Sequence, residues 1–302
     1  MPRTGYVAAR LRALTDLAPL HQPKSLQALN IVSELLPDVH TVACFDTAFH
    51  ARMPEAATTY PLLAEWRTRW DLRRFGFHGL SHAYVSRRAC QMLGRSPEGT
   101  RMVTCHLGAG ASLAAVQDGR SVDTTMGFTP LDGLVMATRS GSVDPELVLW
   151  LEEHAGMPSA ELAATLEHRS GLLALAGTVD MRAIVAAEKA GTPLARLAVE
   201  VYLHRLLAGI TSMAAAMGGL DTLVFTGGVG QNAPSIRQRA ADGLQFLGVE
   251  VDPGRNRKNG GDRNIGSDKA SVDTLVIAAC EDLQIAHETR QVLQSGMTPT
   301  GS

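Results

Sequence analysis

The sequence lacks the charge surplus and the long apolar runs that mark two large classes of protein. Its 302 residues contain 28 Lys and Arg against 30 Asp and Glu, so the net charge is −2. Nucleic-acid-binding proteins normally carry a basic surplus or a basic stripe, so no nucleic-acid partner is predicted. No stretch approaches the roughly 18 uninterrupted apolar residues that a membrane helix needs, so no membrane partner is predicted either.

Cysteines are also few and far apart. The four of them (Cys44, Cys90, Cys105 and Cys280) form no CxxC pair, which argues against a disulfide framework and a zinc site and favours a reducing compartment. The first twenty residues include basic side chains but no apolar core and no small-residue cleavage site, so they are not typical of a secretory signal. We therefore expect a cytoplasmic protein.

The patterning indicates the α/β class. Hydrophobic residues make up 45% of the chain, enough to build one large domain or two ordinary ones. Short β-like runs alternate with amphipathic segments, which is typical of α/β folds. Strands are predicted at 39–45, 102–107, 111–117, 221–226 and 273–277, with a hairpin turn at 118–119. Helices are predicted from a cap at Ser81 to Gly94, over 145–155 and 193–217, and after 281. The polar, glycine-rich stretch 253–267 is predicted to be a mobile loop.

Two glycine-rich turns are candidates for phosphate binding. In VFTGGVGQN the glycines follow a predicted strand and precede a predicted helix, where backbone N–H groups can bind an anion. HLGAGAS joins two predicted strands and could form a second anion-binding nest. A purely structural turn explains either stretch about as well, but two of them in one α/β chain favour a nucleotide.

Several polar residues have both a structural and a functional interpretation. Asp46 follows the predicted strand 39–45, at the end where α/β folds bind ligands, yet it could simply form a turn. Arg139 could be a solvated loop residue, and Glu281 a partner of the helix dipole. His78 and His82 have the spacing of two ligands on one helix face, but no third ligand is evident, so a zinc site is not predicted.

The contexts of these residues resemble one family. FDTAFHARMP, RRFGFHGLSHAYV, HLGAGASLAAV, TTMGFTPLDGLVMATRSGSVDP, VFTGGVGQN and EDLQIA resemble acetate kinase motifs, in order and at compatible spacing. The resemblance runs from about Asp16 to Thr289. It implies the acetate-and-sugar-kinase, heat-shock-protein and actin superfamily, with ribonuclease-H-like domains and an incomplete first domain. Residues 1–47 with 281–302 would be the remnant of the first domain, and 48–280 the second.

The resemblance also implies a reaction and its participants. ATP and acetate would be converted reversibly to ADP and acetyl phosphate, with Mg²⁺ or alternatively Mn²⁺, by a homodimer. Asp46 would bind the metal through water, with Glu281 as the second acidic residue near it, and His78 and Arg139 would contact the transferring phosphoryl group. The remaining implied roles are a methyl pocket at Leu20, Phe77 and Pro130, an ATP phosphate site at His106, Gly108 and Gly110, and an adenosine site at Asp180, Arg182, Gly228 and Asn232.

The sequence departs from the family pattern at several points. Ala109 replaces an Asn, Gln231 replaces a Glu, and Ala137 replaces a Gly. Family members also carry an N-terminal segment with a phosphate hairpin and a carboxylate-binding Arg, which has no counterpart here. From this we expect little activity from the chain by itself and an unpaired edge at 39–45; a true truncation, a misjudged start and a fragment all stay open. Propionate kinase and a non-catalytic nucleotide-binding relative are the alternatives, and a sugar kinase is disfavoured.

Overall fold

The computed structural model describes residues 22–258 and 260–295, and its chain separates into two compact units. The described part of unit 1 is 22–45 with 282–295, and unit 2 is 46–281. Unit 1 contains α2 (Gln22–Leu35) and all but the first residue of α14 (Glu281–Ser295). Within this unit the Cys44 thiol lies 3.9 Å from the carbonyl of Ile285. The identification of the smaller unit with a remnant of a first ribonuclease-H-like domain stays a prediction.

The predicted strand at 39–45 is wrong. The segment is irregular, and Val39 and Phe45 are 58% and 45% exposed. A strand requires a neighbouring strand to pair its backbone N–H and C=O groups, and the described residues place none beside this segment. Asp46 therefore opens a turn instead of ending a strand.

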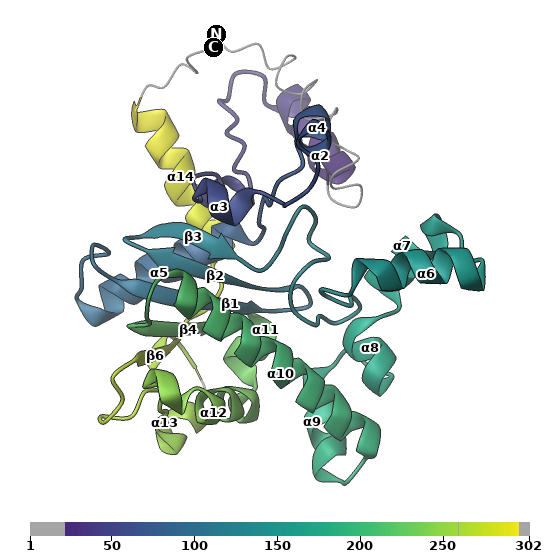
Figure 1. Ribbon diagram of the computed structural model, residues 1–302. Helices are drawn as coiled ribbons and strands as arrows, with labels where there is room; N and C mark the ends of the chain where they lie inside the picture. The colour runs from purple at the N-terminus through teal and green to yellow at the C-terminus, as the bar shows by residue number, and fades with distance from the viewer. Residues whose placement is uncertain (1–21, 259, 296–302) are drawn as a thin grey trace. The chain divides into compact units, whose positions relative to one another are not determined.

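Unit 2 is built on a six-stranded mixed sheet with the order β3-β2-β1-β4-β6-β5 (Figure 1). β1, β2 and β3 form an antiparallel meander, β1, β4 and β6 run parallel, and β5 is antiparallel to β6. Asp118 and Gly119, with φ of 53° and 73°, make the predicted tight turn between β2 and β3. The α/β class is thus confirmed. The strands are β1 (Arg101–Leu107), β2 (Ala111–Gln117), β3 (Arg120–Thr124), β4 (Thr222–Thr226), β5 (Arg263–Asn264) and β6 (Asp273–Val276).

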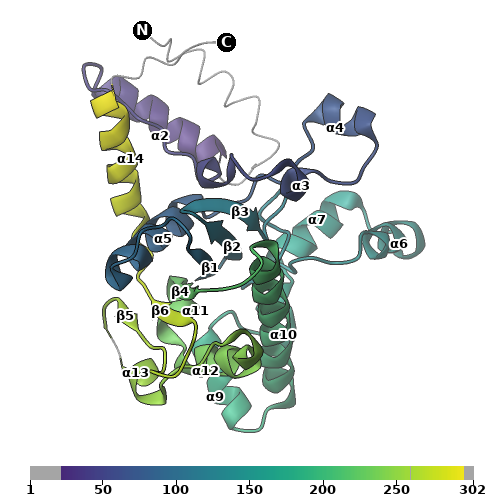
Figure 2. The ribbon, with the colours of Figure 1, turned by 60° about the vertical axis from the view of Figure 1, so that its left-hand side comes forward.

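Helices cover both faces of this sheet (Figures 1 and 2). The long α10 (Pro193–Ala216) packs on one face with α12 (Pro234–Gly243) and α9 (Met181–Lys189), over an apolar core of alternate strand residues such as Val103, Cys105 and Leu107. α5 (Gly79–Leu93) packs on the other face, against a smaller cluster that includes Met102, Ala114 and Val224.

Most predicted helices are confirmed, with two corrections. α5 begins at Gly79, and its N-cap is His78, three residues before the predicted cap Ser81. The helix starts earlier because the carboxylate of Asp46, and not the hydroxyl of Ser81, accepts from the first backbone N–H groups. The stretch 253–267 is not simply a loop, since it contains α13 (Pro253–Arg257) and β5. Asn256 and Ile265 in this stretch are 2% and 0% exposed. Tertiary packing therefore gives these elements a defined structure, although the polar composition of the stretch predicts a loop.

The remaining elements connect these layers. α6 and α7 stand away from the sheet in both views (Figures 1 and 2). Within the described residues no single helix is long and apolar enough to span a bilayer, although Ser159–His168 with Gly171–Lys189, bent by 79°, would pass by length and composition. These elements are η2 (Ala48–His50), α3 (Glu55–Thr58), α4 (Ala64–Trp70), α6 (Pro145–Ala155), α7 (Ser159–His168), α8 (Gly171–Ala176), α11 (Gly227–Asn232), η3 (Gln245–Leu247) and α13 (Pro253–Arg257).

Candidate active site

Asp46 is held rigidly against the start of α5. Its Oδ2 accepts from the backbone N–H of His78 at 2.6 Å, and its Oδ1 from that of Leu80 at 3.4 Å. The backbone carbonyl of Asp46 accepts from the N–H of Gly79 at 2.8 Å, and a Cβ at Gly79 would overlap this carbonyl. Only glycine fits at position 79. These bonds hold Asp46 and His78 in a fixed arrangement.

His78 and Arg139 approach each other around the turn after β1. A Cβ built on Gly110 would lie 3.1 Å from Nε2 of His78 and 3.3 Å from Nη1 of Arg139. The same Nη1 donates to the carbonyl of Pro130 at 3.4 Å. Two side-chain nitrogen atoms therefore flank a single backbone point, at a position where any side chain on Gly110 would come between them.

The His78 ring is packed inside a layer of histidines between α5 and the sheet. It stacks on His106, with ring centroids 4.3 Å apart, and Nδ1 of His106 lies 2.8 Å from the hydroxyl of Ser81. Burial, with a smaller contribution from His78, lowers the pKa of His106 to about 3, although the charge of Asp46 acts in the opposite direction. His106 is therefore neutral near pH 7.

His50 and His82 are completely buried in the same layer. His50 donates from Nε2 to the carbonyl of Phe77 at 3.1 Å and accepts at Nδ1 from Ser121 at 2.7 Å, and burial lowers its pKa to about 4. Burial and the neighbouring histidines hold the pKa of His82 well below its ordinary value of 6.5. Both rings are therefore uncharged hydrogen-bonding groups.

Asp46 and Glu281 fit the donor chemistry of a magnesium–nucleotide site. Burial and then the charge of Asp46 raise the pKa of Glu281, so the two carboxylates repel each other and a cation would relieve that repulsion. No group of three or more His, Cys, Asp or Glu in the described part of the chain could hold a metal alone. Magnesium bound to ATP ordinarily uses one or two protein carboxylates together with the phosphates, so two are sufficient.

The two glycine-rich turns meet at one edge of the sheet. His106 on β1 is directly opposite Thr226 on β4, so the parallel strands end side by side. Gly227 has φ of +76°, and a Cβ there would lie 2.7 Å from the backbone of Leu107, so only glycine allows this approach. The predicted glycine loop after β4 is in fact the short helix α11, with Gly228 open to solvent space and its carbonyl accepting from Asn232 Nδ2 at 2.9 Å.

Comparison with known proteins identifies the relatives of this arrangement. The model of the Acetokinase family matches residues 4–287. The acetate kinase of Pseudothermotoga lettingae is 45% identical over 282 residues, covering 93% of this chain and 70% of that protein. The chain belongs to the acetokinase family.

Solved structures agree with this assignment. The crystal structure of Porphyromonas gingivalis acetate kinase superposes with a TM-score of 0.92 at 39% identity, covering 96% of this chain and 73% of that one. A propionate kinase from Francisella tularensis gives a TM-score of 0.87 at 38% identity, covering 93% and 72%. The acetate-and-sugar-kinase, heat-shock-protein and actin fold predicted from the sequence is confirmed.

The remaining residues assigned by the family resemblance differ in their local contacts and exposure. Asp180 caps α9, accepting from the N–H of Arg182 at 3.0 Å and from its Nε at 3.3 Å, and these bonds lower the pKa of the Asp180 carboxyl. The Arg182 side chain is 83% exposed. Phe77 is partly buried against the large apolar core, whereas Leu20 lies outside the described residues.

The hydroxyl groups of Thr104 and Ser112 were not identified from the sequence as hydrogen-bond partners of the histidines. Thr104 and His106 alternate on β1 and Ser112 begins the corresponding face of β2, so strand periodicity places all three toward α5. That alternation was the available signal. It does not by itself show that Ser81 and His82 of α5 pack onto the same layer.

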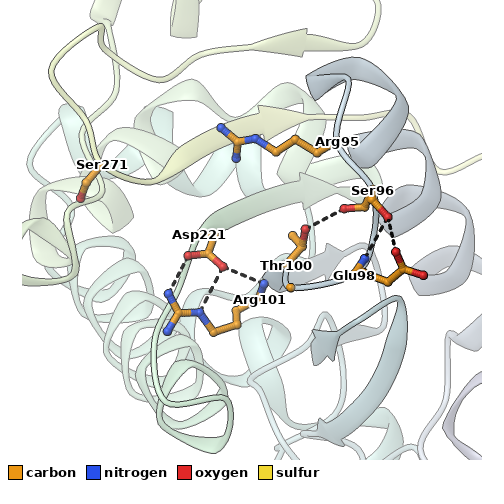
Figure 3. A pocket seen from close by; sticks show the side chains of 8 residues that line it. Arg95, Ser96, Glu98, Thr100, Arg101, Asp221 and Ser271 are labelled. Atoms are coloured by element: carbon orange, nitrogen blue, oxygen red, sulfur yellow. Dashed lines mark hydrogen bonds and ion pairs between the residues drawn. The ribbon is translucent and has the colours of Figure 1, made fainter.

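A shallow pocket of about 510 Å³ lies at the opposite, N-terminal end of β1 (Figure 3). Arg101 there is paired with Asp221 at 2.7 Å, and Arg95 with Asp273 at 2.8 Å. Both guanidinium groups already have carboxylate partners, and the pocket is distant in the fold from the turn that carries Gly110. It is separate from the candidate active site.

Proposed function

We propose that this chain is an acetate kinase, catalysing ATP + acetate ⇌ ADP + acetyl phosphate. The observation that supports this most directly is the placement of His78 and Arg139 around Gly110, with the Asp46 carboxylate bonded to the backbone of His78. Family membership and the named relatives supply the reaction class.

In this proposal the residues act mainly by position and charge. A carboxylate oxygen of acetate attacks the γ-phosphorus of ATP while the bond from phosphorus to the β–γ bridging oxygen breaks. Arg139 and His78 donate to the equatorial oxygens of the transferring group, where charge accumulates. Phe77 and Pro130 line the pocket for the methyl group, and excluding water there limits hydrolysis. Leu20, which the family resemblance assigns to the same pocket, lies outside the described residues.

We propose Mg²⁺ as the metal, with Mn²⁺ as a substitute, held through Asp46 and Glu281. The metal neutralises charge on the phosphates and helps to align the leaving group. His106, Gly108 and Gly110 would lie beside the phosphates, and Asp180, Arg182, Gly228 and Asn232 beside the adenosine. The N–H of Gly108 already bonds to the carbonyl of Gly110 at 2.9 Å, which supports a preformed turn.

A cytoplasmic homodimer completes the proposal. Leu147, Leu149 and Trp150 on α6 are each about half exposed, and exposed apolar side chains gathered on one element are typical of an interface. Light scattering on the purified protein at several concentrations tests the dimer, and a monomer throughout would contradict it.

A coupled assay for acetyl phosphate tests the reaction. Purified protein with Mg-ATP should turn over acetate, although at the low rate expected from the sequence, and substituting propionate should give a lower kcat/KM. Propionate preferred over acetate would favour propionate kinase, which the similarity to the Francisella enzyme keeps as the second candidate. Calorimetric binding of Mg-ATP without turnover of either acid would favour the non-catalytic alternative.

A further inference from the structure

A chain of buried hydrogen bonds leads from the interior of the sheet to His78. The hydroxyl of Ser112 lies 2.9 Å from Nδ1 of His78 and 2.8 Å from Nε2 of His82. Nδ1 of His82 in turn lies 2.7 Å from the hydroxyl of Thr104. Thr104, His82 and Ser112 are all 0% exposed, so this order of partners does not depend on solvent.

The proton positions along this chain follow from the partners of Thr104. Its hydroxyl could donate to His82 at 2.7 Å or to the carbonyl of Ala114 at 3.5 Å, and the first is much the better hydrogen bond. If Thr104 donates to Nδ1 of His82, then Nε2–H of His82 donates to Ser112 and Ser112 donates to Nδ1 of His78. Burial keeps His82 uncharged, which a ring that accepts at one nitrogen and donates from the other requires.

We propose that Thr104, His82 and Ser112 are positioning residues that direct a hydrogen bond onto Nδ1 of His78, so that its proton lies on Nε2 and its ring is held in orientation. Nε2 is the nitrogen beside Gly110 and Arg139, so His78 can donate a hydrogen bond to the phosphoryl group without becoming an imidazolium. This inference rests on the proposed function for the role of His78. The hydrogen-bond chain itself is independent of that role.

Nitrogen NMR of the histidine-labelled chain near neutral pH tests the proton position directly. The His78 signals, assigned by their loss in His78→Gln, should show a bare Nδ1 and a protonated Nε2. In Ser112→Ala the two tautomers of His78 should mix, and Ser112→Thr, which keeps the hydroxyl, should restore the parent pattern. A parent protein with the proton on Nδ1, or a His78 pattern unchanged in Ser112→Ala, would overturn the proposal.

Two further variants test whether the effect passes along the hydrogen bonds of Thr104, His82 and Ser112, which we call the relay, or reflects a general loss of structure. Ser121→Ala is the matched control, because it removes a buried hydroxyl bonded to another buried histidine, His50, at 2.7 Å. It should leave the His78 tautomer as in the parent. Thr104→Val preserves shape at the far end of the chain and should still shift the tautomers of His82 and His78. If Ser112→Ala does not fold, the His78 tautomer in Thr104→Val becomes the test of the relay. A His78 tautomer in that variant that equals the parent's would refute the relay.

Kinetics distinguish failure of the relay from failure of the proposed function. Ser112→Ala should lower kcat for acetyl phosphate formation about tenfold, with little change in KM for acetate, because His78 contacts the transferring group. Recovery by Ser112→Thr is expected. If the parent protein itself makes no acetyl phosphate, the proposed function fails while the NMR result still decides the relay.

Discussion

The two faces of the sheet in unit 2 differ in what they bury. The face under α10 is largely apolar, with Val103, Cys105 and Leu107 of β1 pointing into one large core. The opposite face of the same strand presents Thr104 and His106 to α5, where they bond to His82 and Ser81. An apolar core supplies stability without specifying where a proton lies, whereas the polar layer holds side chains that we assign to the proposed active site. Stability and function are thus divided between alternate residues of one strand.

The largest effect should come from breaking the apolar face. Leu206 on α10 is 1% exposed in the core, so Leu206→Ala should lower the free energy of unfolding by about 2–5 kcal/mol. Leu197→Ala, on the same helix but 45% exposed, is the control and should change little. Urea denaturation measures both. Equal small effects would mean that α10 does not anchor the core.

The second prediction concerns the active-site edge. Arg139→Ala should lower kcat by about 10²–10³-fold while leaving the melting temperature close to that of the parent, since the loss of one charge-stabilising donor has this size. Arg169→Ala, which removes a 60% exposed arginine paired with Glu161, is the control and should keep near-parent kcat. Unchanged kcat in Arg139→Ala would remove that residue from the site.

The polar face should also titrate, which the apolar face cannot do. Unfolded His50 binds a proton at its ordinary pKa of 6.5, but folded His50 does so only near pH 4. Between these values the unfolded state holds more protons, so stability is full above pH 6.5 and is lost as the pH falls toward 4. The loss from His50 should be about 3 kcal/mol, at about 1.4 kcal/mol per pH unit.

His82 and His106, whose pKa values are also lowered by burial, should add to this acid sensitivity. Urea unfolding at a series of pH values from 7 to 4 measures it, and His50→Gln should make the dependence shallower. Stability that is independent of pH across that range would contradict the neutral, buried state of these rings.

The smallest effect tests whether a helix cap is also a nucleotide ligand. Asp180 caps α9 and Asp144 caps α6 in the same way, accepting from an N–H two residues ahead at 3.0 and 2.9 Å. Replacing either by Ala should lower the melting temperature by a similar few degrees. Only Asp180→Ala should also weaken Mg-ATP binding in calorimetry. Equal ATP affinity in the two variants would leave Asp180 as a cap alone.

Local signals made much of the fold predictable. The hairpin at Asp118 and Gly119 follows from turn chemistry, and α10 follows from a proline start and a long apolar pattern. The strand predicted at 39–45 was wrong because the hydrophobic pattern of the segment resembles that of a buried strand. A strand also needs a neighbouring strand to pair with, and a local pattern does not show whether one is present. The predicted start of α5 was wrong because the carboxylate that accepts from the first backbone N–H groups belongs to Asp46, more than thirty residues earlier in the chain.

The sequence by itself determined the family, the α/β class and the identity of the polar residues, because these are carried by ordered motifs and by short-range periodicity. The tertiary structure alone decided which of those residues meet. Ser112 and His82 are thirty residues apart, and their contact exists only because α5 packs on β1, the strand that is paired with β2. The site depends on packing between residues that are far apart in the chain. A hydrogen bond allows its donor–acceptor distance to vary by only a few tenths of an ångström, and the spacing of residues in the sequence does not specify that distance.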